Sequence, residues 1–344
     1  MNNSLPFPTT LDLTPEQIER EYVNIEHSLA KDKTCHFKLT ASHDWKVVDI
    51  DSHPPTPQLP LGTIGLLRRV NPPEAEIEVI AADIPRELHP ADWIEQHLRN
   101  FGQQLETMRR IPSAFGDVGD LLTTFRVGET NFVARSFALK DGSRIYALNC
   151  RVAHHDYQQI AQEFLMAMQS FELVSPTGEV FSEPMAKYPI SAPIKGEFLF
   201  PASWTFQADP DLPPGGTSFS LLNLRQNELV GQFTYAAIEH DQERDHLGLI
   251  ENYLEQLRHN EISIQTDDSS ETKVLPGKMP RWDTVVYGRR HDVAIEVRAT
   301  VVEDSNAWMF FATVGPTKEA DAEAHAINCR AFQLALDSFQ LNSI

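Results

Sequence analysis

Phe164-Leu-Met-Ala-Met-Gln-Ser-Phe-Glu-Leu173 is a ten-residue stretch that recurs in closely similar form as Phe332-Gln-Leu-Ala-Leu-Asp-Ser-Phe-Gln-Leu341. The two copies align without a gap, and Phe, Ala, Ser, Phe and Leu recur at the same positions. Each copy ends one half of the 344-residue chain. A long-range repeat of this kind indicates two structural units built on one plan.

Two more ungapped matches occur between the two halves, in the same order. Ile250-Glu-Asn-Tyr-Leu254-Glu-Gln-Leu257 matches Ile94-Glu-Gln-His-Leu98-Arg-Asn-Phe101, and Thr284-Val-Val-Tyr-Gly288 matches Thr124-Phe-Arg-Val-Gly128. Only the intervening loops change in length. The three matches together predict a tandem repeat.

Proline marks the boundary between the two units. Four prolines and Gly178 fall within residues 174–195, which hold few apolar clusters, so this segment is predicted to be a fairly stiff linker. The predicted organisation is an N-terminal helical extension (1–34), a first repeat (35–173), the linker (174–195) and a second repeat (196–344).

The N-terminal extension carries a helix-start signal. Thr14 can cap the helix, Pro15 suits the first helical position, and Gln17 completes a capping box. Apolar residues then follow at helical spacing as far as Leu29 (Ile18, Tyr22 and Ile25 precede it). We expect one helix here, which either docks on its own chain or binds a partner.

Each repeat has the pattern of an α+β domain with a mostly antiparallel sheet. In the first, alternating or apolar runs predict strands at 36–39, 45–50, 63–67, 76–80, 121–127, 131–139 and 144–152. They also predict a helix that opens at 90–101, with an apolar stripe that extends to Leu105, and a closing helix from about 156 to 170. In the second they predict strands at 218–224, 231–238, 292–302 and 307–314, with helices at 247–259 and from about 317. The strand Ala307-Trp-Met-Phe-Phe311 is apolar on both faces, so it should be central and covered on both sides.

Composition restricts the classes of partner. The formal charge is −20, and a surface that binds nucleic acid or anionic membranes needs clustered Lys and Arg, so neither partner is expected. No basic leader and no long apolar run is present, so we expect no signal peptide and no membrane insertion. Three widely spaced cysteines, Cys35, Cys150 and Cys329, fit reduced thiols in a cytoplasmic protein.

The motif set resembles that of the Mog1/PsbP-like superfamily, in particular its bacterial DcrB-like members, once catalogued as domain of unknown function 1795. The residues that carry the resemblance are Phe37, Leu39, Trp45 and Ser170-Phe171 in the first unit, with Phe198, Phe200, Pro201, Trp204 and Ser338-Phe339 in the second. The resemblance implies tandem α/β/α sandwiches that bind other proteins. Its members include chaperones for the hydrophobic segments of type VI secretion effectors, which work as pairs of domains. Thr40 in the first unit departs from the proline of the second.

Two histidine groups could be read as metal sites, but each has a structural interpretation. His154 and His155 are adjacent in an extended segment and should point to opposite sides, and Asp156 is better explained as the cap of the closing helix, with Gln159 in the capping box. His240-Asp241 and Asp245-His246 flank a predicted helix start, where carboxylates complement the helix dipole.

Nothing else in the sequence matches a catalytic motif. Cys150 and Cys329 lie in or near apolar segments, where a buried inert thiol is expected, and Pro213-Pro-Gly-Gly216 is a turn. Three arginine pairs are more readily intramolecular salt-bridge partners than anion sites: Arg68-Arg69, Arg109-Arg110 and Arg289-Arg290. We therefore expect no catalytic residue, no cofactor and no metal.

The sequence thus favours a non-enzymatic adaptor or chaperone whose partner is another protein, such as a secretion effector or a secretion-system component. It would recognise a helical or hydrophobic segment on a sheet surface or in the cleft between the units. Two alternatives stay open: a hydrolase with a site at the inter-unit cleft, and a structural component of a secretion system.

Overall fold

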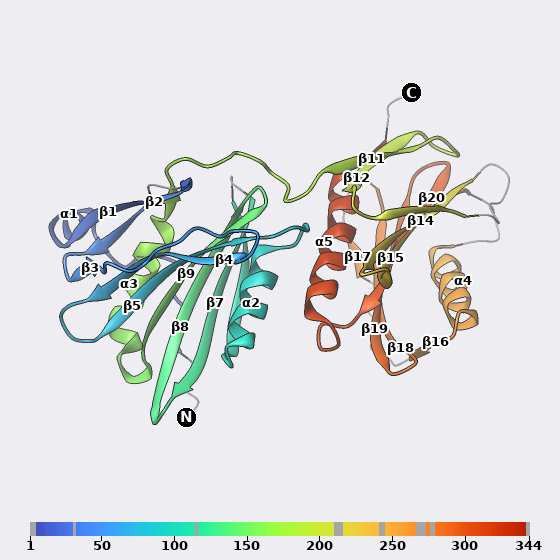
Figure 1. Ribbon diagram of the computed structural model, residues 1–344. Helices are drawn as coiled ribbons and strands as arrows, with labels where there is room; N and C mark the ends of the chain where they lie inside the picture. Colours follow the sequence, from blue (N-terminus) through green and yellow to red (C-terminus); the bar gives the residue numbers. More distant parts are fainter. Residues whose placement is uncertain are drawn as a thin grey trace. The chain divides into compact units, whose positions relative to one another are not determined.

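The computed structural model describes residues 5–29, 32–113, 116–209, 216–240, 245–265, 273–275 and 279–341. The chain divides into two compact units, Met1–Ser182 and Glu183–Ile344 (Figure 1). Within these described residues, no helix is long and apolar enough to cross a membrane. Pro213–Gly215, the greater part of the predicted glycine-proline turn, lie outside the described residues.

Unit 1 contains a large antiparallel sheet and a small one. The large sheet has the order β3 (Trp45–Val47), β4 (Leu61–Arg69), β5 (Ala75–Asp83), β9 (Arg144–Ala153), β8 (Thr130–Asp141), β7 (Gly116–Val127) and β6 (Gln104–Ser113). The small sheet has the order β1 (Tyr22–Leu29), β2 (Asp32–Ser42) and β10 (Glu172–Leu173). The three long strands β7, β8 and β9 form an antiparallel meander, in which Gly142 takes a positive φ of 58° at the β8–β9 turn.

Two helices cover opposite faces of the large sheet of unit 1. Helix α3 (Tyr157–Gln169), together with β2, encloses the main core, to which Leu122 of β7 belongs. Helix α2 (Pro90–Asn100) lies on the other face, where a Cβ on Gly119 of β7 would come within 2.6 Å of Ala91 Cα. Side chains an odd number of residues apart on a strand point to opposite faces, so unit 1 is an α/β/α sandwich.

Unit 2 repeats this layout. Its large antiparallel sheet has the order β13 (Thr205–Ala208), β14 (Thr217–Arg225), β15 (Glu228–Glu239), β20 (Ala307–Pro316), β19 (Val293–Glu303), β18 (Arg281–Arg290) and β16 (Ile262–Gln265), and β17 (Lys273–Leu275) also pairs with β18. The small sheet has the order β11 (Met185–Ile190), β12 (Gly196–Pro201) and β21 (Gln340–Leu341). Strand β11 lies inside the segment predicted as a linker.

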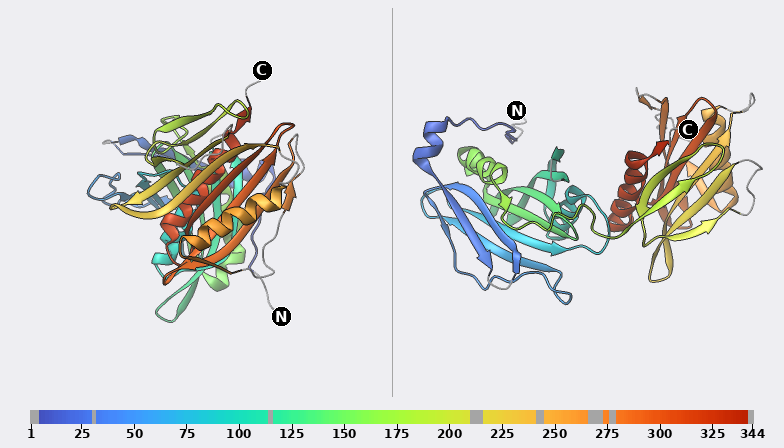
Figure 2. Two further views of the ribbon diagram at one scale, coloured as in Figure 1. Left: turned by 90° about the vertical axis from the view of Figure 1, so that its right-hand side faces the viewer. Right: turned by 90° about the horizontal axis from the view of Figure 1, so that it is seen from above.

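Strand β20 is central and covered on both sides, as predicted. Phe310 belongs to the core beneath helix α4 (His246–His259), which Figure 2 shows running across the sheet. Phe311 points the other way, toward Phe198 of β12 and Phe339 at the end of α5 (Ala322–Ser338), with ring centroids 6.0 and 5.3 Å away. The predicted fold class, two tandem α+β units of the α/β/α type, is confirmed.

The repeated Ser-Phe motif ties each closing helix to the small sheet. Ser170 Oγ donates a hydrogen bond to Met166 O at 2.7 Å and accepts one from Thr40 N at 2.7 Å. In unit 2, Ser338 Oγ donates to Leu334 O at 2.6 Å and accepts from Leu199 N at 2.8 Å. The same hydroxyl thus satisfies an end-of-helix carbonyl and a strand amide in both units, and this explains why the stretch recurs.

The N-terminal prediction is correct at the start of the helix and wrong beyond it. Helix α1 (Pro15–Glu21) begins with the expected capping box between Thr14 and Gln17. Tyr22–Leu29, predicted to continue the helix, is instead strand β1 and pairs antiparallel with β2. Pairing there satisfies the backbone of the exposed β2 edge and lets Ile25 and Leu29 pack on the core of unit 1.

The match between Gly128 and Gly288 is not a structural equivalence. Gly128 lies in the β7–β8 turn, closed by the pair Val127–Thr130, with a φ of 59°. Gly288 lies inside β18, where a Cβ would come within 2.5 Å of Ser263 O of β16. The equivalent turn in unit 2 is His291-Asp292, which joins Arg290 to Val293. Each glycine is required for its own reason, a positive φ in one unit and a close strand approach in the other.

Two helix boundaries also differ from prediction. Helix α2 ends at Asn100, so Leu105, assigned to its apolar stripe, lies in strand β6. Helix α5 begins at Ala322 rather than near Thr317, because Asp321 accepts a hydrogen bond from Ala324 N and caps it.

Candidate functional site

The first histidine group forms no metal cluster among the described residues. His154–Asp156 make a short 3-10 turn before α3, and the His155 side chain is 78% exposed, with Nε2 3.2 Å from Asp156 Oδ2. Asp156 occupies the N-cap position of α3 but makes no capping hydrogen bond, so the predicted capping bond is wrong. The cause is the helical backbone at Asp156 (φ −98°, ψ −11°), because a capping residue needs an extended one.

The second group is explained by capping and ring packing. Asp245 caps α4 and accepts a hydrogen bond from Gly248 N at 2.8 Å, as the helix-start interpretation predicted. The His246 ring stacks on Trp282 at 4.3 Å, and the His240 ring lies 4.7 Å from Trp308. Asp241 lies outside the described residues.

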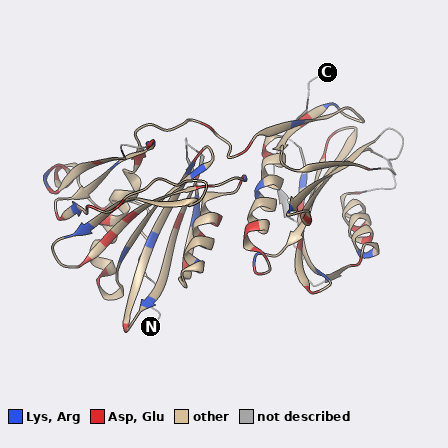
Figure 3. Ribbon diagram, in the orientation of Figure 1, with Lys and Arg blue, Asp and Glu red and all other residues tan. Residues whose placement is uncertain are grey.

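Charged side chains of both signs are interspersed along both units (Figure 3). Four of the six arginines in the predicted pairs bind carboxylates of the same chain: Arg68 with Glu76, Arg69 with Asp44, Arg109 with Asp120, and Arg110 with Asp92. For these the salt-bridge interpretation is confirmed. Arg289 instead donates to the backbone carbonyl of Asp292 at 3.2 Å.

The N-terminal segment lies over a buried charge cluster of unit 1. Arg135 is fully buried and donates to Asp120 Oδ1 at 3.1 Å, and Arg109 pairs with the same carboxylate. The guanidinium groups of Arg109 and Arg135 lie 4.0 and 4.8 Å from the centroid of the Phe7 ring, and Arg135 also donates to Pro8 O at 2.8 Å. An extended stretch of chain is therefore held on this face by cation–π contacts and by a backbone carbonyl.

Helix α2 presents a row of aromatic rings toward its outer side. Trp93, His97 and Phe101 follow at intervals of four residues, with ring centroids 5.1 and 5.0 Å apart. Phe101, the C-cap residue of α2, is 67% exposed, whereas Trp93 and His97 are partly buried and Ile94 and Leu98 are buried. We call Trp93, His97 and Phe101 the α2 aromatic row.

The positions that match this row are buried in unit 2. By the sequence match between the helices, they are Leu249, Tyr253 and Leu257 of α4, each less than a tenth exposed. The common fold therefore does not require solvent-accessible rings at these positions. The exposure of Phe101 and the partial exposure of Trp93 and His97 are properties of unit 1.

A polar cluster lies between α5 and β19 in unit 2. His325 Nε2 is 3.3 Å from Glu296 Oε1 and 3.5 Å from Cys329 Sγ. Arg298 Nε donates to Glu296 Oε1 at 2.5 Å. Because His325 and Cys329 are four residues apart on α5, they share the helix face that packs toward Glu296 on β19.

The charges within this cluster stabilise one another. Burial would lower the pKa of His325, but hydrogen bonds with Cys329 and Glu296 outweigh it and raise the pKa to about 9. Burial would raise the pKa of Glu296, but the contacts from His325 and Arg298 outweigh it and lower that pKa. The imidazolium form of His325 is therefore favoured beside the Glu296 carboxylate.

The sequence-based prediction for Cys329 was wrong. The thiol was expected to be buried and inert, yet Cys329 is only partly buried and contacts His325, whereas Cys150 is fully buried as expected. The His-x-x-x-Cys spacing on a predicted helix could have revealed this pair. No sequence signal connects it to Glu296, because the strand register that brings that residue to α5 is a tertiary property.

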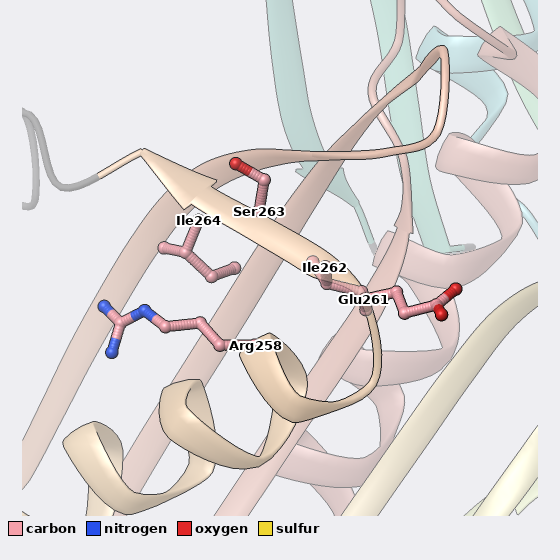
Figure 4. Close-up of a pocket in the computed structure, with 5 residues that line it drawn as sticks. All are labelled: Arg258, Glu261, Ile262, Ser263 and Ile264. Atoms are coloured by element: carbon pink, nitrogen blue, oxygen red, sulfur yellow. The ribbon is translucent and has the colours of Figure 1, made fainter.

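A shallow hollow lies between the end of α4 and β16, lined by Arg258, Glu261, Ile262, Ser263 and Ile264 (Figure 4). The Arg258 and Glu261 side chains point in opposite directions in this view. These groups do not converge on a common point, so the hollow supports no catalytic assignment.

Comparisons with known proteins returned similar solved structures only. No family model matches the chain, and no curated protein matches it. The solution structure of PsbP from Synechocystis sp. PCC 6803 is 14% identical, covers 44% of this chain and 92% of its own, and has a TM-score of 0.35. The type VI secretion immunity protein TplEi of Pseudomonas aeruginosa is 13% identical, with 80% and 94% coverage and a TM-score of 0.25. The Tle4–Tli4 complex gives 10% identity, 87% and 97% coverage and a TM-score of 0.25. PsbP, which belongs to the superfamily that the motifs resemble, is thus among the solved structures to which this chain is similar.

Proposed function

We propose that this protein is a non-enzymatic protein-binding module, an adaptor or chaperone for a helical or hydrophobic segment of another protein. The α2 aromatic row carries the proposal. Protein interfaces are enriched in aromatic side chains, and a few such anchors supply most of the binding energy. Phe101, which is 67% exposed at the C-terminal end of α2, is the kind of residue that a partner can bury.

Unit 1 also binds a stretch of its own chain, on the face of the large sheet opposite to α2. The segment around Phe7 and Pro8 lies there without regular secondary structure, bound through an aromatic ring and a carbonyl oxygen. This contact illustrates how the sandwich binds an extended chain. We propose that a secreted effector, or a component of a secretion system, is the partner of the exposed surface.

Two of the similar solved structures contain a bound peptide or protein. TplEi has been solved in complex with a peptide named "L", and Tli4 in complex with Tle4. These titles describe those proteins. For this chain the proposal depends on its own surface.

The polar cluster of Glu296, His325 and Cys329 does not form the catalytic triad that the hydrolase alternative would need. A Cys-His-carboxylate relay needs the thiol on one imidazole nitrogen and the carboxylate on the other. In the cluster, Glu296 Oε1 and Cys329 Sγ both lie nearest to the same atom, His325 Nε2. One nitrogen cannot accept the thiol proton and donate to the carboxylate at once, so we favour binding over catalysis.

The test is affinity purification from the native host with identification of co-eluting proteins by mass spectrometry. The wild type should retain a partner in stoichiometric amount, and Phe101→Ala and Trp93→Ala should lose it. Val180→Ala is the matched control, because Val180 is 69% exposed in the same unit and lies outside α2. A partner that Phe101→Ala retains in full would contradict the role of the row. A wild-type protein that elutes alone under gentle conditions would contradict the adaptor proposal.

A further inference from the structure

We propose that Glu296, His325 and Cys329 form a binding site for a divalent transition-metal ion, with Zn²⁺ as the best match. Each residue offers one ligand atom, and the three atoms lie within 4.8 Å of one another. The inference is independent of the protein-binding proposal, because the cluster lies in unit 2 and shares no residue with the α2 aromatic row.

The spacing of the ligand atoms suits a tetrahedral zinc ion. Zinc binds imidazole nitrogen and carboxylate oxygen at about 2.0–2.2 Å and thiolate sulfur at about 2.3 Å. Tetrahedral angles then separate oxygen from nitrogen by about 3.3–3.5 Å and nitrogen from sulfur by about 3.5–3.6 Å. The observed distances are 3.3 Å from Glu296 Oε1 to His325 Nε2 and 3.5 Å from His325 Nε2 to Cys329 Sγ.

Glu296 Oε1 and Cys329 Sγ both approach His325 Nε2, the nitrogen that a shared ion would use. Cys329 Sγ also lies 3.9 Å from Nδ1, so the thiol is beside the ring, and rotation of the Cys329 side chain would bring the sulfur to face an ion on Nε2. A carboxylate and a thiolate together neutralise a divalent charge. Arg298 donates to the ligand oxygen of Glu296 at 2.5 Å and would serve as the outer partner that orients this carboxylate.

The ligand types select the ion. One thiolate, one imidazole and one carboxylate suit Zn²⁺, whereas Mg²⁺ and Ca²⁺ require a set of oxygen ligands. Three protein ligands leave a fourth tetrahedral position open. Because Cys329 and His325 are only partly buried, an ion can reach the cluster from solvent.

The fold does not impose this cluster, since unit 1 lacks it. By the alignment of the closing helices, His325 and Cys329 correspond to Tyr157 and Ala161 of α3. By position after the hairpin turn, Glu296 corresponds to Val133 of β8. All three counterparts in unit 1 are buried core residues. The same fold therefore accommodates apolar core residues at these three positions in unit 1, and unit 2 has three potential metal ligands at the corresponding positions.

The experiment is a titration of the chelator-treated, reduced full-length protein with Co²⁺, which reports its ligands by absorption. The wild type should bind one equivalent and develop the visible bands of tetrahedral cobalt together with a thiolate-to-cobalt charge-transfer band. Added Zn²⁺ should displace the cobalt and abolish both kinds of band. Cys329→Ser should remove the charge-transfer band, and His325→Gln should weaken binding by at least about ten-fold. Cys150→Ala is the matched control, because that thiol is fully buried on β9 and should leave the spectrum unchanged.

Two results would overturn the proposal. One is a wild-type protein without a charge-transfer band at a several-fold excess of Co²⁺. The other is a Cys329→Ser spectrum identical to that of the wild type. Circular dichroism of each variant checks folding. Zn²⁺ should also raise the thermal midpoint of the wild type but not that of Cys329→Ser, because a ligand stabilises only the state that binds it.

Discussion

At the scale of single residues, the most informative side chain is the serine of the repeated stretch. Ser170 and Ser338 are each both donor and acceptor, between the last turn of a helix and the backbone of a strand. A hydroxyl is the smallest side chain that can perform both roles, and an alanine there leaves a strand amide without its partner. The sequence marks these residues by recurrence, and the structure supplies the reason.

We expect Ser170→Ala to lower the free energy of unfolding of unit 1 by about 1–3 kcal/mol, the cost of an unsatisfied polar group. Ser338→Ala should have a similar effect on unit 2. Urea unfolding followed by circular dichroism measures both. Ser305→Ala serves as the control, because Ser305 is exposed and bonds only to its neighbour Asp304, so a change within about 0.5 kcal/mol is expected. Equal effects for Ser170→Ala and Ser305→Ala would contradict the assigned role.

At the scale of elements, Arg144 links the two sheets of unit 1. It lies at the start of β9 and binds Asp32 of β2 at 2.8 Å and Asp83 of β5 at 2.7 Å. Burial would raise the pKa of Asp32, but hydrogen bonds from Thr34 and Arg144 outweigh this and lower the pKa below its ordinary value of 3.8. The ionised carboxylate is therefore favoured in the folded state.

A pH dependence follows from the sign of this shift. The folded pKa of Asp32 lies below the unfolded one, so its contribution to stability is complete above the ordinary value of 3.8 and is lost as the pH falls through the folded pKa. We expect Asp32→Asn to reduce the free energy of unfolding of unit 1 at neutral pH. In strong acid, the difference in this free energy between the variant and the wild type should become smaller. Urea unfolding at a series of pH values tests this. A difference that grows as the pH falls would contradict it.

Also at the scale of elements, periodicity alone did not determine the end of α1. Tyr22, Ile25 and Leu29 fit a helical stripe, yet they belong to strand β1. The free edge of β2 offered hydrogen bonds that a local pattern cannot anticipate, and tertiary pairing outweighed helical spacing. Strand β11 within the predicted linker has the same explanation, because β12 supplies its partner.

At the scale of the whole molecule, each unit has a hydrophobic core made from its own residues. The core of unit 1 surrounds α3 and β2, and unit 2 has a core beneath α4. Domains with their own cores generally fold independently.

We therefore expect residues 1–182 and 183–344, expressed separately, each to unfold in a single cooperative transition. The free energy of unfolding of each fragment should equal that of the same unit in the full chain within about 1 kcal/mol. Differential scanning calorimetry provides the measurement. A fragment that lacks a transition, or that gains one only when mixed with the other, would contradict independent folding.

The sequence by itself determined the duplication, the α+β class, most strands and helices, the capping of α1 and the central position of β20. These features depend on local patterns of apolar, proline and capping residues, which a single chain displays directly. The tertiary structure alone decided the strand β1, the true register of the β18–β19 hairpin, the exposure of Phe101 in the α2 aromatic row and the meeting of Glu296 with His325 and Cys329. These depend on which surfaces pack together, and a strand register that differs by one residue would turn Glu296 to the opposite face of the sheet.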